Sequence, residues 1–194
     1  MEDRLKKQMD FMMEVDKMKK IGRQTYIADA SRKENDAEHS WSLAVMCMIM
    51  AEHANEEIDV LRTIEMVLVH DLVEIDAGDT YAYDTAGNQT KRERELAAAE
   101  RIFSILPEDQ AQFIRGLWDE FEEGETPEAR FANTVDKVQP LTLNDITGGI
   151  AWREHDVAAA QVVERNSRTH EGSEALWDYC RKIIDKNKEK GNLK

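Results

Sequence analysis

The sequence is poor in cysteine, proline and glycine, and this scarcity excludes several protein classes. Its 194 residues contain two cysteines, three prolines and nine glycines. Cys47 and Cys180 are far apart and lack Cys-x-x-Cys spacing, which excludes a disulfide-stapled secreted scaffold. Breaking residues are few, apolar residues recur at intervals of three and four, and long period-two alternation is absent. The sequence therefore predicts an all-α fold.

Long hydrophobic runs and positive charge are also scarce. No apolar run approaches the roughly 20 residues that a membrane helix needs, and residues 1–7 contain no apolar signal core. Lysine and arginine total 26 against 40 aspartates and glutamates, a net charge of −14 that would repel a nucleic-acid backbone. We therefore expect a cytoplasmic protein that binds neither membranes nor nucleic-acid polymers.

The length suits one domain over residues 1–194, because a chain of this size can bury roughly 70% of its extended surface. Residues 21–34 lose the helical period and are interpreted as a long irregular connection, and residues 79–88 as a polar loop. The pattern predicts a bundle of about seven to eight helices. We expect these at about 5–20, 35–54, 60–76, 90–106, 107–122, 127–144, 156–167 and 173–190.

The most apolar stretch of the chain, residues 63–78, contains His70 and Asp71. Asp71 occupies a helical position where the pattern asks for an aliphatic side chain. A buried carboxylate without a partner costs several kcal/mol, so this pair indicates a bound divalent cation. Glu74 lies one turn beyond His70 and faces the same volume, and Gly78 suits the left-handed end of the helix.

Two further helices place a candidate ligand beside an apolar stripe. His39 lies in the first turn of a helix that Asn35 and Glu38 begin with a capping box, and Asp136 lies within the apolar pattern of residues 131–138. Two imidazoles and two carboxylates form a mixed nitrogen and oxygen set that suits Mn, Fe, Co, Ni or Zn better than calcium. The alternative is that these are core residues whose polar groups form hydrogen bonds within the protein and bind no metal. Four such residues on apolar helices favour the metal site over this alternative.

In this order, His39, the His70-Asp71 pair and Asp136 resemble the H…HD…D signature of the HD-domain metal-dependent phosphohydrolases. The resemblance covers about residues 18–143. It implies a helical HD domain in which these four side chains bind one divalent ion per subunit, among Mn, Co, Ni, Fe, Zn and Mg. A water molecule activated by that ion would be the nucleophile.

A narrower resemblance concerns the Glu-His-Ser run at 38–40 and the His-Asp-x-x-Glu-x-x-x-Gly-Asp run at 70–79. These runs are similar to the small bacterial 5'-deoxynucleotidases and the related HD-domain-containing protein 2 group. The resemblance implies a homodimer that removes phosphate from nucleoside 5'-monophosphates, with 2'-deoxy forms preferred. It assigns acid-base chemistry to Glu74, positioning of the reacting group to Asp79, and phosphate binding to Arg23.

Charge counting requires cations near this site. Four carboxylates and a phosphate monoester bring far more negative charge than one divalent ion balances. Residues 21–34 offer Arg23, Arg32 and Lys33, of which Arg23 is the first choice because an arginine fork binds phosphate bidentately. We therefore add these three cations to Asp71 and Asp79 as candidate substrate-binding residues.

Two positions depart from the deoxynucleotidase pattern. Gln24 follows Arg23 where that group has tryptophan, and Thr80 opens a Thr-Tyr-Ala-Tyr run where a Leu-Pro type of sequence is usual. Both are candidate contacts to sugar or base, so selection of the sugar is open. Two alternatives remain: an HD hydrolase for another phosphorylated small molecule, and a regulatory protein that binds nucleotides without hydrolysis. The second His-Asp dipeptide, at 155–156, lies at a polar helix start and is interpreted as a cap.

Overall fold

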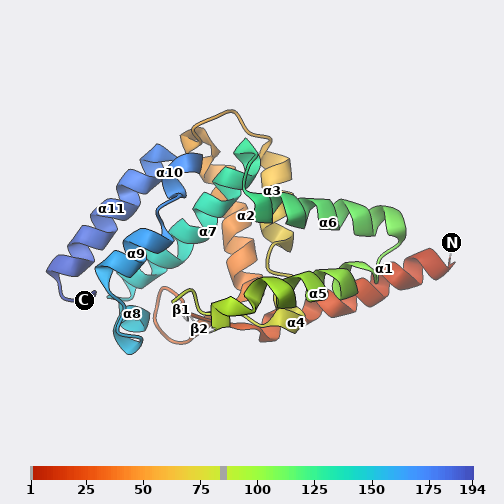
Figure 1. Cartoon of the computed structure of the whole chain (residues 1–194), viewed down its shortest axis with the longest axis horizontal. Helices are drawn as coiled ribbons and strands as arrows, with labels where there is room; N and C mark the ends of the chain where they lie inside the picture. The colour runs from red at the N-terminus through yellow and green to blue at the C-terminus, as the bar shows by residue number, and fades with distance from the viewer. Residues whose placement is uncertain (1, 84–86) are drawn as a thin grey trace.

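The chain folds into a bundle of α-helices with a small β-hairpin on one side (Figure 1). The computed structural model describes residues 2–83 and 87–194, and residues 84–86 of the expected polar loop lie outside this range. Eight helices in the described part have seven residues or more, which confirms the expected helical bundle. These are α1 (Glu2–Val15), α2 (Asp36–Met50), α3 (Val60–Val69), α5 (Lys91–Phe103), α6 (Glu108–Glu123), α7 (Pro127–Ile146), α9 (Ala159–Arg165) and α11 (Glu174–Glu189).

Shorter pieces connect these helices. Helix α4 (Glu74–Ala77), α8 (Ile150–Glu154) and α10 (Thr169–Gly172) are each five residues or fewer, and strands β1 (Gly22–Tyr26) and β2 (Lys33–Asn35) form the hairpin. Single 3₁₀ turns cover Asp16–Lys20, Ala51–His53 and Gly87–Gln89. None of the described helices has the length and apolarity that crossing a bilayer requires.

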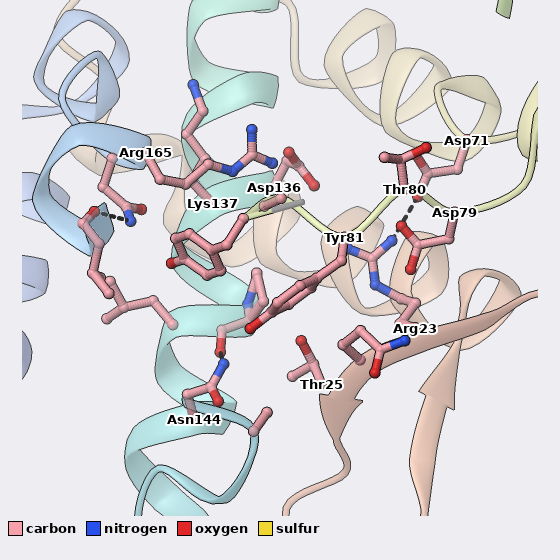
Figure 2. A pocket seen from close by; sticks show the side chains of 18 of the residues that line it. Arg23, Thr25, Asp71, Asp79, Thr80, Tyr81, Asp136, Lys137, Asn144 and Arg165 are labelled. Carbon is pink, nitrogen blue, oxygen red and sulfur yellow. Dashed lines mark hydrogen bonds and ion pairs between the residues drawn. The ribbon is translucent and has the colours of Figure 1, made fainter. Parts of the chain in front are cut away.

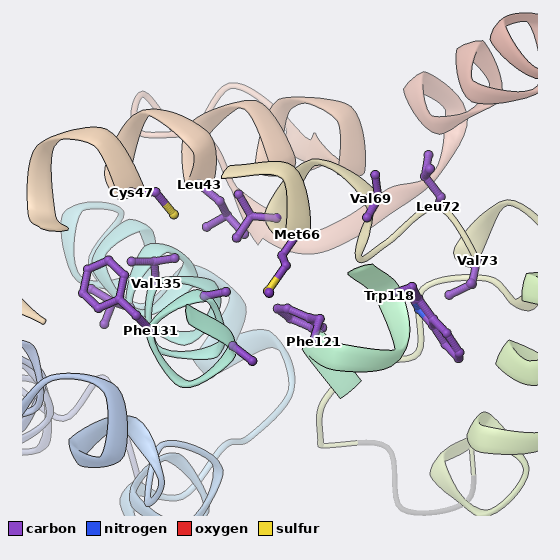
Figure 3. Close-up of a cluster of buried hydrophobic side chains, with 14 of the residues drawn as sticks. Leu43, Cys47, Met66, Val69, Leu72, Val73, Trp118, Phe121, Phe131 and Val135 are labelled. Carbon is purple, nitrogen blue, oxygen red and sulfur yellow. The ribbon is translucent and has the colours of Figure 1, made fainter. Parts of the chain in front are cut away.

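Helices α2, α3, α6 and α7 share the main apolar core (Figure 3). Each core side chain that is fully buried contributes about 1.5–3 kcal/mol of transfer free energy. Because α2, α7 and the turn after α3 carry the candidate metal ligands, the core fixes the positions of those ligands. The labelled core residues are Leu43, Cys47, Met66, Val69, Leu72, Val73, Trp118, Phe121, Phe131 and Val135.

Local capping sets where the ligand-bearing helices begin. The side chain of Asn35 accepts a hydrogen bond from the Glu38 amide at 3.0 Å, and Glu38 accepts one from the Asn35 amide at 3.3 Å. This capping box was expected, and it places His39 in the first turn of α2. Thr126 caps α7 through the Ala129 amide at 3.1 Å, with Pro127 in the first turn.

The segment 21–34, interpreted from sequence as irregular, contains the antiparallel β1–β2 hairpin. Gly22 pairs with Asn35 and Tyr26 with Lys33, with a register shift between these pairs. The strands were missed because they are short and polar and carry no apolar alternation. The hairpin leads directly into α2, which begins at Asp36. The Asp36 amide donates to the Ile21 carbonyl at 3.2 Å and so ties the start of the helix to the start of the hairpin.

The continuous helix expected over residues 60–76 is interrupted in the structure. Residues 70–73 form a turn between α3 and α4, in which the Glu74 amide donates to the Asp71 carbonyl at 2.9 Å, an i to i+3 bond. The apolar period continues through this turn, so the sequence pattern did not reveal it. Gly78 then ends α4 with a φ of +75°, a positive value as expected at this position.

Two other expected helices differ in extent. Of the helix expected over residues 156–167, only Ala159–Arg165 is helical in the structure. The helix cannot begin at Asp156, because this residue has a φ of 56°, outside the right-handed helical range. Helix α2, although apolar on most of its surface, is buried on one side only. Trp41, Met48 and Ile49 on its other side are 67%, 64% and 64% exposed.

Candidate metal centre and phosphate pocket

Three separated segments bring four candidate ligands together. His39 comes from α2, His70 and Asp71 from the turn after α3, and Asp136 from α7. Asp136 Oδ1 lies 3.0 Å from His39 Nε2 and 3.7 Å from His70 Nε2. Asp71 completes the set, with carboxylate oxygens 3.1 Å from His70 Nε2 and 3.9 Å from His39 Nε2. The four residues predicted from the sequence therefore converge on one small volume.

Both imidazoles are oriented by a partner at Nδ1. His39 Nδ1 lies 3.1 Å from Gln139 Oε1, and the Gln139 amide donates to Glu34 Oε1 at 2.8 Å. His70 Nδ1 lies 2.9 Å from the Val67 carbonyl. Because these partners accept hydrogen bonds, each Nδ1 carries the proton and each Nε2 faces the carboxylates. This is the arrangement by which proteins orient histidine ligands toward a metal ion.

The donor set fits a bound divalent cation. A neutral Nε2 presents a lone pair to carboxylate oxygens that also carry lone pairs, so the contacts are attractive only when a proton or a metal cation lies between them. Burial disfavours the charged form of His70, but Asp71 and Asp136 outweigh burial and raise the pKa of His70 to about 10. His70 Nε2 makes no well-aligned hydrogen bond among the described residues. The group formed by His39, His70 and Asp136 can therefore hold a metal ion.

A second group of carboxylates adjoins the first. Oxygens of Asp36, Asp71 and Glu74 lie within 4.8 Å of one another, and all three residues are buried. Burial, followed by repulsion from Asp71, raises the pKa of Asp36 to about 6. Burial and the neighbouring Asp71, Asp36 and Asp79 carboxylates raise the pKa of Glu74 well above its usual value. Crowding of negative charge thus favours a proton on Glu74.

Arg23 is the cation that balances these carboxylates. Its Nη1 contacts Asp71 Oδ2 at 3.0 Å and Asp36 Oδ1 at 3.2 Å, and its Nε lies 3.8 Å from Glu34 Oε2. The side chain is 14% exposed. It extends from β1 toward the cup, as we call the group formed by His39, His70, Asp71 and Asp136 (Figure 2). The hairpin that the sequence pattern missed is therefore the element that positions the predicted phosphate-binding arginine.

A cavity of about 240 Å³ opens onto both groups. Its walls include five of the residues expected to contact substrate, namely Arg23, Gln24, Asp71, Asp79 and Thr80. Arg32 and Lys33 do not line it. Arg32 is exposed and pairs with Glu38 at 2.6 Å, and Lys33 Nζ donates to Gln24 Oε1 at 2.6 Å. The structure thus separates these two cations from the pocket.

The loop that carries Asp79 and Thr80 is held by an arginine that sequence reasoning did not select. Arg94, from α5, donates to the Ala77 carbonyl, to Thr80 Oγ1 at 2.9 Å and to the Gly87 carbonyl at 3.2 Å. Burial raises the pKa of Asp79, although Arg23 opposes this. Arg94 therefore acts on the pocket through the position of the loop.

Aromatic side chains form the outer part of the cavity (Figure 2). The Tyr81 ring lies 5.2 Å from the Tyr83 ring and 4.4 Å from the His155 imidazole, and Trp152 lines the same cavity. His155 Nε2 lies 3.3 Å from Gln24 Oε1. The exposed His155, read from sequence as part of a polar cap, thus contacts two residues that line the pocket.

Several residues of the site were not selected from the sequence. Asp36 was missed because an acidic residue in the first helical turn is common for reasons of helix polarity alone. Glu34 and Gln139 carry no distinctive spacing to His39, so only the folded structure relates them. Lys137 follows Asp136 within the apolar pattern of residues 131–138 and lines the cavity. A charged side chain in such a pattern is a signal that could have selected it from the sequence.

The comparisons with known proteins agree with this geometry. A protein-family model described as HD domain matches residues 15–177. A solved structure named "predicted metal-dependent phosphohydrolase", from Magnetospirillum magnetotacticum MS-1, shares 47% sequence identity and a TM-score of 0.94. The alignment covers 99% of this chain and 96% of that one. An HD-domain phosphohydrolase from Listeria innocua, 20% identical with a TM-score of 0.60 over 90% of this chain and 82% of that one, shares the fold.

More distant relatives carry a functional name. The human 5'-deoxynucleotidase HDDC2 is 28% identical over 134 residues, which is 69% of this chain and 64% of the human protein. The protein of the same name from Dictyostelium discoideum is 32% identical over 113 residues, 56% of this chain and 60% of that one. The match thus spans less than two thirds of each relative. With the family model over most of its length, the chain belongs to the HD-domain family of metal-dependent phosphohydrolases.

Proposed function

We propose that this protein hydrolyses the phosphate ester of nucleoside 5'-monophosphates, with a preference for 2'-deoxyribonucleotides. One observation carries the proposal: a two-histidine, two-aspartate cup lies beside Arg23 and Glu74 at a cavity of about 240 Å³. The relatives named 5'-deoxynucleotidase support the nucleotide part. The aromatic wall supports it too, since a nucleobase packs well against tyrosine and tryptophan rings.

One divalent ion per subunit, among Mn, Co, Ni, Fe, Zn and Mg, would supply Lewis-acid activation of water and of the phosphate when bound. The side chains that would hold it are His39, His70, Asp71 and Asp136. Arg23 donates hydrogen bonds to Asp36 and Asp71 through Nη1, and no hydrogen bond joins Nη2 to a described residue. Nη2 is therefore the group with which Arg23 would bind a phosphate oxygen.

Glu74 and Asp79 would handle the protons. Phosphate-ester hydrolysis breaks the bond between phosphorus and the 5'-oxygen, and the departing oxygen needs a proton. Glu74 lines the cavity and is surrounded by carboxylates that favour its protonated form, so it is placed to donate that proton. Asp79, on the loop after Gly78, would orient the attacking water.

The test is phosphate release from the eight ribo- and deoxyribonucleoside 5'-monophosphates, after chelation and separate re-addition of Mn, Co, Mg and Zn. We expect metal-dependent release and faster turnover of the deoxy series. Release only from other phosphorylated compounds would replace the substrate but keep the chemistry. Binding of nucleotide without any release would instead favour a regulatory protein and contradict the proposal.

Glu74→Gln sharpens this test. The amide keeps the shape of the side chain but has no acidic proton to transfer to the leaving oxygen. We expect the variant to bind metal and nucleotide normally and to lose turnover. Unchanged hydrolysis would contradict the role of Glu74.

We also propose that the protein acts as a homodimer in the cytoplasm. Trp41, Val45, Met48 and Ile49 form an exposed apolar stripe on α2, and Leu61 of the adjoining α3 is 65% exposed. A second copy could cover this uncharged face despite the net charge of −14. Two buried free thiols suit a reducing compartment. Analytical ultracentrifugation should give a dimer that Met48→Glu converts to a monomer; a wild-type monomer would contradict this.

A further inference from the structure

One arginine of the pocket has no hydrogen bond or ion pair with any described residue. The chain contains thirteen arginines, and within the described residues twelve of them form a hydrogen bond or an ion pair. Arg165 is the exception, and it lines the cavity. In a chain with 40 acidic residues an arginine is easily paired, so an unpaired one that faces a pocket indicates a site for an external anion.

The direction of the side chain supports this reading. Arg165 is the last residue of α9, and Figure 2 shows its guanidinium extending toward Asp136. Arg23 approaches the same region from β1, on a different side of the view. The two arginines therefore line one cavity from segments that are far apart in the sequence.

A lysine that lines the same cavity also lacks a partner in the part of the chain that the structure describes. Of the three partly buried lysines, Lys33 bonds to Gln24 and Lys91 pairs with Glu95. Lys137 lines the cavity and has no hydrogen bond or ion pair with any described residue. The cavity thus contains two cations, Arg165 and Lys137, that have no partner among the described residues.

The negative charge of the cup explains why further cations would be needed to bind a phosphate. Arg23 already contacts the carboxylates of Glu34, Asp36 and Asp71, so much of its charge is balanced inside the protein. A phosphate monoester near neutral pH carries almost two negative charges and must approach Asp71 and Asp136. Free positive charge is therefore required from elsewhere, and Arg165 supplies it.

We propose that Arg165 is a second phosphate-binding residue, which contacts the phosphoryl oxygens of the substrate while Arg23 contacts them from the hairpin side, with Lys137 adding positive charge beside it. This rests on the proposed phosphohydrolase function. It assigns the part of the cavity next to Arg165 and Lys137 to the phosphate, and the part next to Tyr81 to the nucleoside.

The experiment compares Arg165→Met, Arg165→Lys and Arg168→Met in the Mn²⁺-loaded protein. Arg168 is the matched control, because it lies three residues further on, is exposed and pairs with Glu171 at 2.7 Å. Calorimetry measures the binding of inorganic phosphate and of a nucleoside without phosphate. Elemental analysis confirms equal metal content in all proteins.

Loss of one charge-assisted contact should weaken phosphate binding by Arg165→Met about tenfold or more. We expect unchanged nucleoside binding, partial recovery in Arg165→Lys, and wild-type values in Arg168→Met. The KM for the preferred nucleotide should rise in parallel. Phosphate affinity of Arg165→Met within about twofold of wild type, or a wild-type protein that does not bind phosphate, would overturn the inference.

The outcome is separable from the substrate proposal. If the wild type hydrolyses no nucleoside monophosphate but Arg165→Met still weakens phosphate binding, the proposed substrate fails and the role of Arg165 stands. If nucleotides are hydrolysed and Arg165→Met changes neither phosphate affinity nor KM, the role of Arg165 fails and the substrate stands.

Discussion

The two walls of the pocket are built in different ways. The inner wall consists of His39, His70, Asp71 and Asp136, which lie on or beside long helices that share the main core. The outer wall comes from a loop, from the five-residue α8 and from the seven-residue α9, and includes Tyr81, Trp152 and Arg165. Inner residues are bound to protein partners, whereas Arg165 has none among residues 2–83 and 87–194. The comparison indicates that ion binding is fixed by the fold, while substrate selection depends on short connecting elements.

The largest effect should come from breaking the inner wall itself. Asp136→Asn removes the charge that lies 3.0 Å from His39 and 3.7 Å from His70. We expect turnover to fall roughly a thousandfold or more, with metal content well below one ion per chain. Metal analysis and phosphate release measure both.

Asp156→Asn is the matched control, because Asp156 belongs to the other His-Asp dipeptide and is exposed. Its φ of 56° is a conformation that asparagine also tolerates. Wild-type activity is expected for this variant. Comparable losses in the two variants would show that the inner wall has no special role.

A smaller effect on the same wall should follow from Gln139→Leu. This change removes the partner of His39 Nδ1 and leaves Glu34 without its amide donor. We expect the metal Kd to rise by roughly 10- to 100-fold, as for other residues that orient a ligand. Metal titration measures this. The exposed Gln112→Leu should bind metal as the wild type does, and equal affinity of the two variants would be contrary evidence.

Arg94→Met tests whether the loop next to Asp79 can be disturbed without affecting the inner wall. Arg94 bonds to the Ala77 and Gly87 carbonyls and to Thr80. We expect kcat/KM to decrease about tenfold, since misplaced catalytic groups lose much of their effect. Metal affinity should remain unchanged. Loss of metal in this variant would contradict the separation of the two walls. Arg181→Met, which changes an exposed residue of α11, serves as control.

The smallest effect is expected far from both walls, at Glu14. Contacts with Lys17 at 2.7 Å and Arg101 at 2.5 Å lower the pKa of Glu14. A depressed pKa stabilises the folded protein above the unfolded pKa, near 4.3, and this stabilisation is lost as the pH falls through the folded value. Glu14→Gln should therefore reduce the free energy of unfolding by no more than about 1 kcal/mol at pH 7.

Urea unfolding at pH 7 and pH 3 measures this difference, which should shrink at the lower pH. Metal binding should be the same in both proteins. A difference that grew as the pH fell would contradict the assigned ion pairs.

The helical bundle was predictable because its signals are local and repeated. Apolar spacing, the Asn35 capping box and the Thr126 cap each specify a helix or its start from a few neighbouring residues. The turn at 70–73 was not predictable, since apolar residues keep the helical period through it. The hairpin was also missed, because its pairing of Gly22 with Asn35 depends on contacts across the loop.

The candidate site divides in the same way. His39, the His70-Asp71 pair and Asp136 could be selected because each places a polar group in an apolar helical pattern. Gln139 and Asp36 could not, because their role depends on three-dimensional contacts with His39 and Arg23. Arg165 ends a short helix as an ordinary basic residue would, and it is distinguished only by its place at the cavity and its lack of a partner among the described residues.

The central claim is that one divalent ion binds between α2, α3 and α7. Anomalous diffraction from crystals of the Mn²⁺-loaded protein tests it most directly. The account predicts a single strong anomalous peak per chain, bounded by Nε2 of His39, Nε2 of His70 and the carboxylates of Asp71 and Asp136. Saturated crystals with no peak in this cup, or with a peak only at surface carboxylates, would contradict it.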